Sequence, residues 1–521
     1  MKFLLASLLV GCPALSQALT LYATHYSGHL YTLEFDPVKQ KIQVKHKQDD
    51  CGISPSWLTI DRESKTLYCL DESGNAVSGI SGNLTTYLIA ADGMLAKQVQ
   101  VKTLPGAVHG TVYGKDKKFI ALANYGSGAV ETFSLPLHNS QGNLQSFLFG
   151  SAKGASQPHA AYVDPVTKSF LWVPDLGADL IRVYSIDQET GQLALCPDVP
   201  PAKPGSGPRH AAFITGPGGS SRMYVANEKS NSLSVFDVNY GGNFDKRTED
   251  MSTLFGKRYP PRLVKRSAPL FCPTVKHKEE IVFDNVKPDT KANLAEIRAV
   301  DNRHLYVSLR GDKFFANFDS IFHLSVGGHG NESTESIESS SRVTASSSQI
   351  PFHTGTARDP GSTKSCEETH STGNTRPTES STKAPKETHT TQGTNQTVQK
   401  RTDIPTSSRN DGPKSTAFVT STGEQTEQNE RSGPTDSHND ESIHNGEIKV
   451  HRYPSYGSIP RTFDISPDGR YLAIGNQFSA NIAIVHRNPK TGELGGILTV
   501  ISLPPKGSEQ SWNGISSVIW G

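Results

Sequence analysis

The sequence lacks an excess of charge of either sign. Its 521 residues include 52 Lys and Arg against 51 Asp and Glu, which gives a formal net charge of +1. Nucleic-acid-binding proteins normally carry a basic surplus, so this balance removes the electrostatic argument for such a partner. The hydrophobic fraction is 35%, and the 46 glycines among 521 residues bring it to about 44%. This is still below the roughly 45–50% apolar residues, glycine included, of typical soluble domains. A polar segment that dilutes a normal core would explain the shortfall.

Long apolar runs are absent too, which argues against a membrane span. The run Phe3–Val10 is too short to cross a bilayer, and no other stretch approaches the ~18–20 apolar residues that a spanning helix needs. Lys2 before this run, with the small residues Ser16 and Ala18 after it, is typical of a secretory signal peptide, residues 1–18. A buried terminal helix or strand is the alternative interpretation. We expect a secreted protein, extracellular or in the cell wall.

Several motifs of catalysis and metal binding are missing. There is no G-x-S-x-G elbow, no P-loop, and no CxxC or Cys/His cluster with zinc spacing. We therefore predict no covalent nucleophile, no metal and no cofactor. Beyond Cys12 in the signal, the cysteines are Cys51, Cys69, Cys196, Cys272 and Cys366. Because this number is odd, at least one thiol is unpaired or bonded to another chain. Proximity favours a disulfide between Cys51 and Cys69.

The composition changes sharply between about residues 327 and 445. Ser, Thr, Glu, Asn, Gln and Lys dominate there, without a period of either 2 or 3.6. Such a segment buries too little apolar surface to offset its conformational entropy, so we expect a long disordered Ser/Thr-rich insertion that resembles an O-glycosylated stalk. A smaller irregular insertion covers about residues 241–290. Three sequons are predicted glycosylation sites in a secretory context: Asn83, Asn331 and Asn395.

Outside these segments a unit of about 50 residues repeats. Short runs rich in aromatic and aliphatic residues, such as Phe119–Asn124 and Phe170–Asp175, end in a polar residue and are flanked by turn residues. The runs before them open alike, and the openings at Pro55, Val108, Pro158 and Pro208 begin 53, 50 and 50 residues apart. Helical periodicity is nearly absent.

This pattern predicts an all-β fold, a seven-bladed β-propeller. Residues 19–326 form blades 1–6, and residues 446–521 form the last blade and the ring closure. The final run, Ile515–Trp520, is a strand that completes the first blade. An array of β-sandwiches is the structural alternative.

In a propeller, the start of the innermost strand and the end of the second strand lie on one face. Two sets of polar residues therefore converge. The first contains His109, His159, Arg209, His210, Glu296 and Arg461. The second contains Asn124, Asp175, Asn227, Glu228, Arg310, Asn476 and Gln477. Asn or Asp at a strand end often only caps a turn, an interpretation that fits Asn124, Asp175 and Asn476. Buried cations need a partner, and Glu228 is a natural one.

Several motifs occur in a fixed order: Pro158–Pro165 with Val173–Asp179, Gly207–Phe213 with Tyr224–Glu228, and Ile459–Phe463 with Ser466–Arg470. In this order they resemble the seven-bladed lactonase family, which holds bacterial-type 6-phosphogluconolactonases and fungal 3-carboxy-cis,cis-muconate cyclases. The resemblance covers the chain except the signal peptide and the two insertions. It implies four catalytic residues: His159, Arg209, Glu228 and Arg461. Thr462 and Ala161 stand where many members have His.

These residues predict a metal-free enzyme that forms or opens a lactone of a polycarboxylate, like a carboxymuconate cyclase. Arg209 and Arg461 would hold carboxylates by their paired N–H donors, and Glu228 or His159 would transfer the proton. The sequence does not decide between these two. Further candidates for substrate binding are His109, Asn124, Asp175, His210 and Gln477.

Other functions stay open. One is a catalytically silent secreted glycoprotein, a surface antigen or adhesin that binds extracellular matrix or cell-wall glycan. Another is a 6-phosphogluconolactonase-like hydrolase, which we rank lower because its substrate is intracellular. An intracellular peptide-binding scaffold conflicts with the signal peptide. The expected partner is a small carboxylate or lactone, with no nucleic acid and no membrane span.

Overall fold

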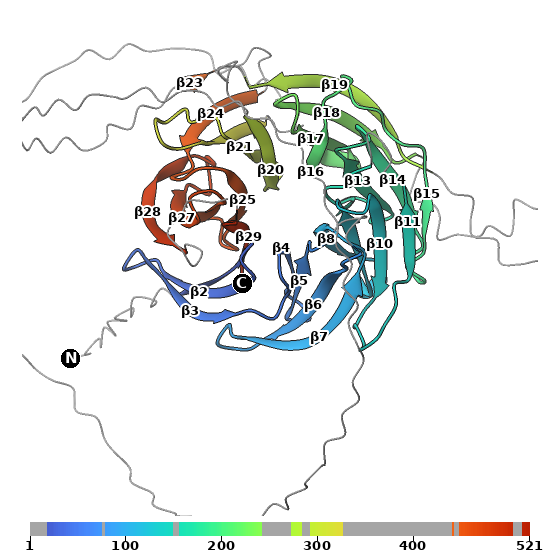
Figure 1. Ribbon diagram of the computed structural model, residues 1–521. Helices are drawn as coiled ribbons and strands as arrows, with labels where there is room; N and C mark the ends of the chain where they lie inside the picture. The colour runs from blue at the N-terminus through green and yellow to red at the C-terminus, as the bar shows by residue number, and fades with distance from the viewer. Residues whose placement is uncertain are drawn as a thin grey trace, which may run out of the picture. The chain divides into compact units, whose positions relative to one another are not determined.

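Seven antiparallel sheets surround a common axis, each as one blade of a propeller (Figure 1). The computed structural model describes residues 18–74, 79–149, 156–241, 272–283, 292–326, 440–441, 448–503 and 513–521. Helical structure in these residues is limited to two short 3₁₀ turns, η1 (Lys115–Lys117) and η2 (Pro217–Gly219). No helix among them has the length and apolarity to cross a membrane. The predicted all-β fold with seven blades is confirmed.

The strands of blades 1 to 4 follow in order from the central channel outwards. Blade 1 contains β29 (Ile515–Trp520), β1 (Leu19–His25), β2 (His29–Asp36) and β3 (Lys41–Gln48). Blade 2 contains β4 (Pro55–Asp61), β5 (Thr66–Asp71), β6 (Gly82–Ile89) and β7 (Leu95–Thr103). Blade 3 contains β8 (Ala107–Tyr113), β9 (Phe119–Asn124), β10 (Ala129–Ser134) and β11 (Gln145–Leu148). Blade 4 contains β12 (Tyr162–Val163), β13 (Phe170–Asp175), β14 (Leu180–Ile186) and β15 (Leu193–Leu195).

Blades 5 to 7 follow the same plan. Blade 5 contains β16 (Pro208–Thr215), β17 (Ser221–Asn227), β18 (Ser232–Asn239) and β19 (Thr274–Val282). Blade 6 contains β20 (Asn293–Val300), β21 (His304–Arg310), β22 (Ser320–Val326), β24 (Ile448–Pro454) and β23 (Asp440–Glu441). Blade 7 contains β25 (Pro460–Ile465), β26 (Tyr471–Asn476), β27 (Asn481–Arg487) and β28 (Leu494–Ser502).

Two outer strands differ from the sequence-based boundaries. β19 lies inside the segment 241–290, which we expected to be irregular, and pairs along its length with β18. Its sequence is rich in Lys and Glu because an outermost strand is half exposed, and this hides its strand character. β24, which we expected in the last blade, pairs with β22 and belongs to blade 6. Apart from β23, the expected disordered insertion lies outside the described residues.

The hydrophobic core lies between the blades rather than in one central mass. The described residues form seven clusters of buried side chains, one between each pair of neighbouring blades. Between blades 5 and 6, for example, Leu233 packs in one cluster with Leu294 and Phe322. The alternation of side chains along each strand presents apolar residues to both neighbours, since a blade is covered on both faces.

The ring closes where the two ends of the chain pair. β29 runs antiparallel to β1 and becomes the innermost strand of blade 1, as the sequence indicated. Trp520 at its end is wholly buried. Its backbone N–H donates to Oδ2 of Asp464 in blade 7 at 2.9 Å, and its Nε1 donates to the Asp464 carbonyl at 3.1 Å. The closure joins the last strand to the first by backbone pairing and gives blade 1 its fourth strand.

Two disulfides hold the described cysteines. Cys51–Cys69 confirms the predicted bond. Cys196–Cys272, which the sequence did not single out, links blade 4 to the start of β19 and closes a separation of 76 residues. Cys366, the sequons Asn331 and Asn395, and residues 1–17 of the predicted signal peptide lie outside the described residues. Nδ2 of Asn83 donates to Asp71 at 2.6 Å, so a glycan there would have to displace this hydrogen bond.

Candidate active site

An irregularity recurs at the start of the innermost strands and aims selected side chains at the channel mouth. The pairing with the second strand skips one residue between Pro208 and His210, and again between Pro460 and Thr462. The skipped residues are Arg209 and Arg461. Blades 2 and 3 show the same shift. Such a β-bulge re-aims a side chain without disrupting the sheet, and the preceding proline fits because that position begins a strand.

A backbone hydrogen bond beside each bulge places a second residue next to it. In six blades, the residue just after the second strand donates its N–H to the carbonyl two positions before the bulge. In blade 5, Glu228 N–H donates to the Gly207 carbonyl at 2.8 Å. The residues placed in this way are Tyr26, Glu72, Tyr125, Leu176, Glu228 and Gln477. Arg310 ends β21 and takes the corresponding place in blade 6, where Asn293 is its partner in the ladder.

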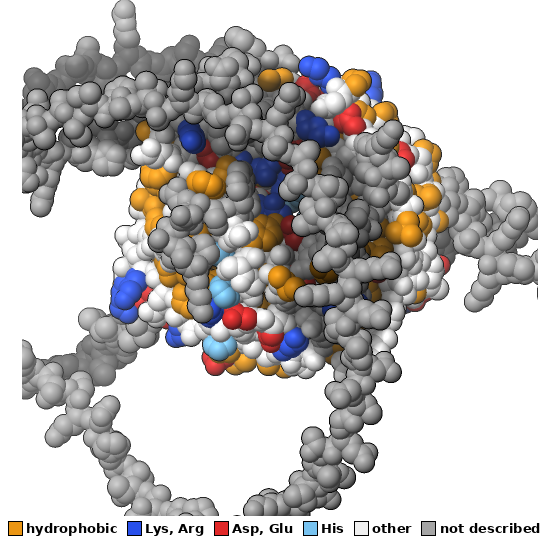
Figure 2. Space-filling model, in the orientation of Figure 1, with side chains coloured by type: hydrophobic (Ala, Val, Ile, Leu, Met, Phe, Trp, Pro, Cys, Tyr) orange, Lys and Arg blue, Asp and Glu red, His pale blue; other side chains and the backbone are white. Residues whose placement is uncertain are grey.

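These positions build a cluster of opposite charges at the mouth of the ring. Nε of Arg209 and Nη2 of Arg310 lie 2.8 and 3.0 Å from Oε2 of Glu228. Burial would raise the pKa of Glu228, but Arg310, Arg209 and Arg461 together lower the pKa below its ordinary value. Glu228 is therefore ionised, while its side chain stays 23% exposed. Basic side chains with acidic ones beside them lie toward the centre of the ring in the space-filling view (Figure 2).

Arg461 is less tightly paired than the other two arginines. Its Nη2 lies 3.7 Å from Oε2 of Glu72, which also accepts a hydrogen bond from the Tyr26 hydroxyl at 3.0 Å. Its guanidinium carbon lies 5.3 Å from the centre of the Tyr26 ring. Burial raises the pKa of Glu72, and Arg461 opposes that rise. Arg461 thus keeps N–H donors that can bind an anion.

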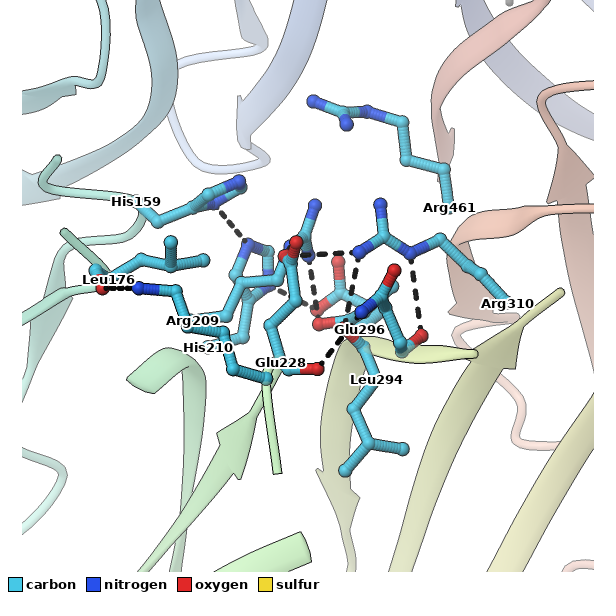
Figure 3. Close-up of polar contacts among 12 residues, drawn as sticks. His159, Leu176, Arg209, His210, Glu228, Leu294, Glu296, Arg310 and Arg461 are labelled. Carbon is cyan, nitrogen blue, oxygen red and sulfur yellow. Dashed lines mark hydrogen bonds and ion pairs between the residues drawn. The ribbon is translucent and has the colours of Figure 1, made fainter. Parts of the chain in front are cut away.

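His159 lies beside this cluster and is joined to a deeper pair. Its Nδ1 lies 3.2 Å from Nε2 of His210, and Nδ1 of His210 lies 3.2 Å from Oε1 of Glu296 (Figure 3). Burial, with the charge of Arg209 next in importance, lowers the pKa of His159 well below its ordinary value. Burial likewise lowers the pKa of His210 to about 4. Both rings are neutral near pH 7.

The four residues that resemblance marks as catalytic therefore come together from blades 4, 5 and 7. Figure 3 shows His159, Arg209, Glu228 and Arg461 converging on one space. Arg209 is wholly enclosed, and burial lowers its pKa to about 9, which still leaves it charged at neutral pH.

The predicted substrate-binding residues lie at different depths around the site. His210 lies directly behind His159. His109 lies deeper, with its ring 4.2 Å from Trp57 and 5.5 Å from His210 between centres. Gln477 occupies the position after a second strand, where its N–H binds the Ile459 carbonyl at 2.8 Å.

Asn124 and Asp175 have no exposed surface. Asp175 accepts hydrogen bonds from Ser156, from the N–H groups of Gln157 and Ala178, and from Nε of Arg182 at 2.9 Å. This arrangement fits the capping interpretation of Asp175, because its carboxylate is occupied by the local chain.

Sequence reasoning left several residues of the cluster out of the candidate list. Glu72, Tyr26 and Tyr125 each follow the last residue of a second strand, the same place that Glu228 holds. Alignment of the repeats by this position would have found them. Arg310 and Glu296 stood in the converging sets but not among the selected residues. Thr462 and Ala161, at positions where His was expected, are wholly buried.

The sequence matches the family described as "Lactonase, 7-bladed beta-propeller" over residues 18–344 and 442–507. The chain belongs to this family. It is therefore a lactonase-type propeller, and the resemblance inferred from its motifs is confirmed. Among the described residues, no group of three or more His, Cys, Asp or Glu is arranged to hold a metal ion.

Curated relatives of this lactonase-type propeller include two fungal proteins. A "Probable 6-phosphogluconolactonase" of Arthroderma benhamiae is 33% identical over 307 residues, which cover 57% of this chain and 67% of the relative. "Muconate cycloisomerase 1" of Cutaneotrichosporon cutaneum is 28% identical over 207 residues, which cover 37% of this chain and 53% of the relative. Among solved structures, the periplasmic gluconolactonase PpgL of Pseudomonas aeruginosa has a TM-score of 0.57 at 18% identity, covering 97% of this chain and 99% of its own. That likeness concerns the fold.

Proposed function

We propose that the protein opens the lactone ring of an anionic substrate by hydrolysis. One observation carries this proposal: Arg209, Arg310 and Arg461 lie around Glu228 at the mouth of the ring, beside the neutral imidazole of His159. Three cations against the carboxylates of Glu228 and Glu72 leave a positive excess. A phosphate or carboxylate carried by the lactone would satisfy that excess through charge-assisted hydrogen bonds.

The roles of the residues follow from how each is engaged. Arg209 and Arg310 are bound to Glu228 and form a rigid base for the site. Arg461, the loosely paired cation, binds the substrate anion or the oxyanion that forms when water attacks the lactone carbonyl. His159 takes a proton from that water, the C–O bond of the ring breaks, and the leaving alkoxide recovers the proton. The product is the open hydroxy acid.

Names of relatives support the choice of substrate class. The relative with 33% identity is called a probable 6-phosphogluconolactonase, and so are several bacterial relatives, without the word "probable". A phosphorylated sugar lactone has an anion and a lactone in one molecule. This ranks hydrolysis of a phosphorylated or carboxylated lactone above the cyclisation that the motifs first suggested.

A comparison of charged and uncharged lactones tests the proposal. We expect 6-phosphoglucono-δ-lactone to be hydrolysed with a kcat/KM about 10- to 10²-fold above that of glucono-δ-lactone, since one buried charge-assisted pair contributes about 1.5–3 kcal/mol. Arg461→Ala should remove most of this difference. Arg470→Ala is the matched control, because Arg470 pairs with Asp468 on the surface. Equal rates for both lactones with a folded protein would overturn the proposal.

Cyclisation of a carboxymuconate is the second candidate, because one relative is named a muconate cycloisomerase. The same arginines suit a substrate with two or three carboxylates, and the proton transfer is to carbon rather than to oxygen. Incubation with 3-carboxy-cis,cis-muconate, followed by loss of the absorbance of the conjugated diene, separates the two reactions. Inactivity in both assays would favour the silent glycoprotein.

We further propose that the protein works outside the cytosol. The apolar N-terminal run supports this, as do the two disulfides, because such bonds persist in oxidising compartments. Expression of the full chain and of a chain without residues 1–18, followed by assay of the medium, tests it. The full chain should be secreted and the shortened one retained. Retention of both would contradict the proposal.

A further inference from the structure

Three titratable side chains from three blades form a line that leads inward from the channel mouth. His159 precedes β12, His210 belongs to β16 and Glu296 to β20. The contacts are 3.2 Å from Nδ1 of His159 to Nε2 of His210, and 3.2 Å from Nδ1 of His210 to Oε1 of Glu296. All three residues are buried, Glu296 to 2% exposure. In a buried line of this kind, each contact needs one atom that carries a proton and one that accepts it.

The proton positions follow from the end of the line. Burial would raise the pKa of Glu296, but His210, Arg298 and Arg209 lower it, so its carboxylate is ionised and only accepts. Nδ1 of His210 must therefore carry a proton. Because neutral imidazole has only one N–H, Nε2 of His210 is the acceptor, and Nδ1 of His159 must donate to it. The remaining nitrogen of His159, Nε2, then holds a lone pair.

The lone pair on Nε2 of His159 is available to accept a proton. Among the described residues, Nε2 of His159 has no hydrogen-bond partner, and the ring lies edge-on to Tyr125 with 5.6 Å between centres. The charged groups that act on the ring, Arg209, Arg461 and Arg310, are those assigned above to the substrate site. Glu228, the other candidate base, already forms ion pairs with two guanidinium groups through Oε2. Its basicity is lowered accordingly.

We infer that Glu296 and His210 are positioning residues that hold His159 as the Nδ1–H tautomer, so that Nε2 of His159 is the general base of the proposed lactone hydrolysis. The inference rests on the proposed function for its chemistry, but the tautomer exists without substrate. It also decides between Glu228 and His159, which the sequence left open.

Each proton of the proposed hydrolysis is accounted for by His159. As the water oxygen bonds to the lactone carbonyl carbon, one water proton moves to Nε2 of His159, which becomes an imidazolium. Its positive charge is stabilised through His210 by the carboxylate of Glu296, in the manner of the carboxylate that orients a catalytic histidine in serine proteases. When the ring C–O bond breaks, the same proton passes from Nε2 to the departing alkoxide oxygen. No other reactant is needed.

The tautomer can be observed directly in the resting protein. The chain has 18 histidines, so the signals of His159 are assigned by their loss in His159→Asn. Long-range ¹H–¹⁵N spectra of the full chain with ring-labelled histidine distinguish a protonated Nδ1 from a protonated Nε2. We expect neutral His159 with the proton on Nδ1 at about pH 7. A proton on Nε2 would overturn the inference.

Glu296→Gln tests the same line through catalysis. The amide either turns its NH₂ to His210, which reverses both tautomers, or presents its oxygen without the charge. In both cases kcat should fall by about 10²-fold or more with KM changed less than about threefold. Glu131→Gln replaces a carboxylate that is also buried, in blade 3, and serves as the control with unchanged kcat.

Outcomes for the inference and for the function are distinguishable. If the wild-type protein hydrolyses the lactone but Glu296→Gln keeps its kcat, the inference is wrong and the function stands. If no lactone is hydrolysed while the spectra show the Nδ1–H tautomer that Glu296→Gln abolishes, the positioning line is real and the proposed function is wrong. Thermal melting of each variant identifies a simple loss of folding.

Discussion

Arg209 and Arg310 bind the same carboxylate oxygen, Oε2 of Glu228, at 2.8 and 3.0 Å, although they come from different blades and are 101 positions apart in the chain numbering. Two guanidinium groups this close repel each other unless an anion lies between them. Glu228 supplies that anion in the resting protein, so it stabilises the junction of blades 5 and 6 while it organises the site.

Loss of Glu228 should therefore destabilise the protein in a way that an added anion repairs. We expect Glu228→Ala to lower the free energy of unfolding by about 3–5 kcal/mol, because removal of one partner leaves buried charge unpaired. Inorganic phosphate should raise the melting temperature of this variant more than that of the wild type. Glu189→Ala, which removes an exposed partner of Lys115, is the control and should change little. A Glu228→Ala variant as stable as the wild type without phosphate contradicts this account.

Glu131 predicts a stability that falls as pH rises. Burial raises the pKa of this carboxyl from 4.5 to about 7, although the Leu104 N–H that binds Oε2 opposes the rise. Between these values the folded state binds more protons than the unfolded state, so stability is lost as pH increases from about 4.5 through 7. The loss is on the order of 3 kcal/mol. Glu131→Gln should remove it, as denaturant unfolding at several pH values would reveal. Parallel pH profiles for both proteins would refute the prediction.

The pH dependence of catalysis should also report the buried histidine. Burial lowers the pKa of His159 well below 6.5, with Arg209, His210, Arg461 and Arg310 adding to the effect. A base with a lowered pKa stays neutral as the solution is acidified, so the acid limb of kcat/KM should lie well below about pH 6.5. Initial rates corrected for spontaneous lactone hydrolysis test this. An inflection at an ordinary histidine value would show that another group limits the reaction.

The bond between Cys196 and Cys272 should stabilise blades 4 and 5. Because it closes a separation of 76 residues, loop-closure entropy predicts a loss of about 4 kcal/mol when Cys196 and Cys272 are both replaced by Ser. Denaturant unfolding measures this loss. Peptide mapping without reductant should recover the two cysteines in one linked fragment from the wild type. Separate fragments would contradict the pairing.

The sequence predicted the blade count, the closing strand, the Cys51–Cys69 bond and the convergence of His159, Arg209, Glu228 and Arg461. These features follow from the repeat, because each blade has the same opening and the same polar strand end. The sequence did not reveal β19, since a charged outer strand looks like a loop when its pairing partner is unknown. It also missed Glu72, whose importance comes from Arg461 in a blade almost 400 positions away.

The sequence alone does not predict which partner a charged residue binds in this fold. Asp175 and Glu228 occur at neighbouring places in their repeats, yet Asp175 is taken up by its own loop and by Arg182, whereas Glu228 reaches the channel. Asp175 is the last residue of its second strand, whereas Glu228 is the first residue after its second strand. The bulge and the repeated backbone hydrogen bond determine which of these two positions in the repeat faces the channel.

The attachment of the segment between β22 and β24 has a consequence for how this protein can change. Val326 and Ile448 are paired residues of adjacent strands, so the chain leaves and re-enters the sheet at the same rung of the ladder. Whatever length is spliced in at this point, the register of blade 6 and the arginines at the channel mouth keep their places. Evolution or an engineer can therefore lengthen, exchange or shorten the chain between Val326 and Ile448 independently of the chemistry at the channel mouth.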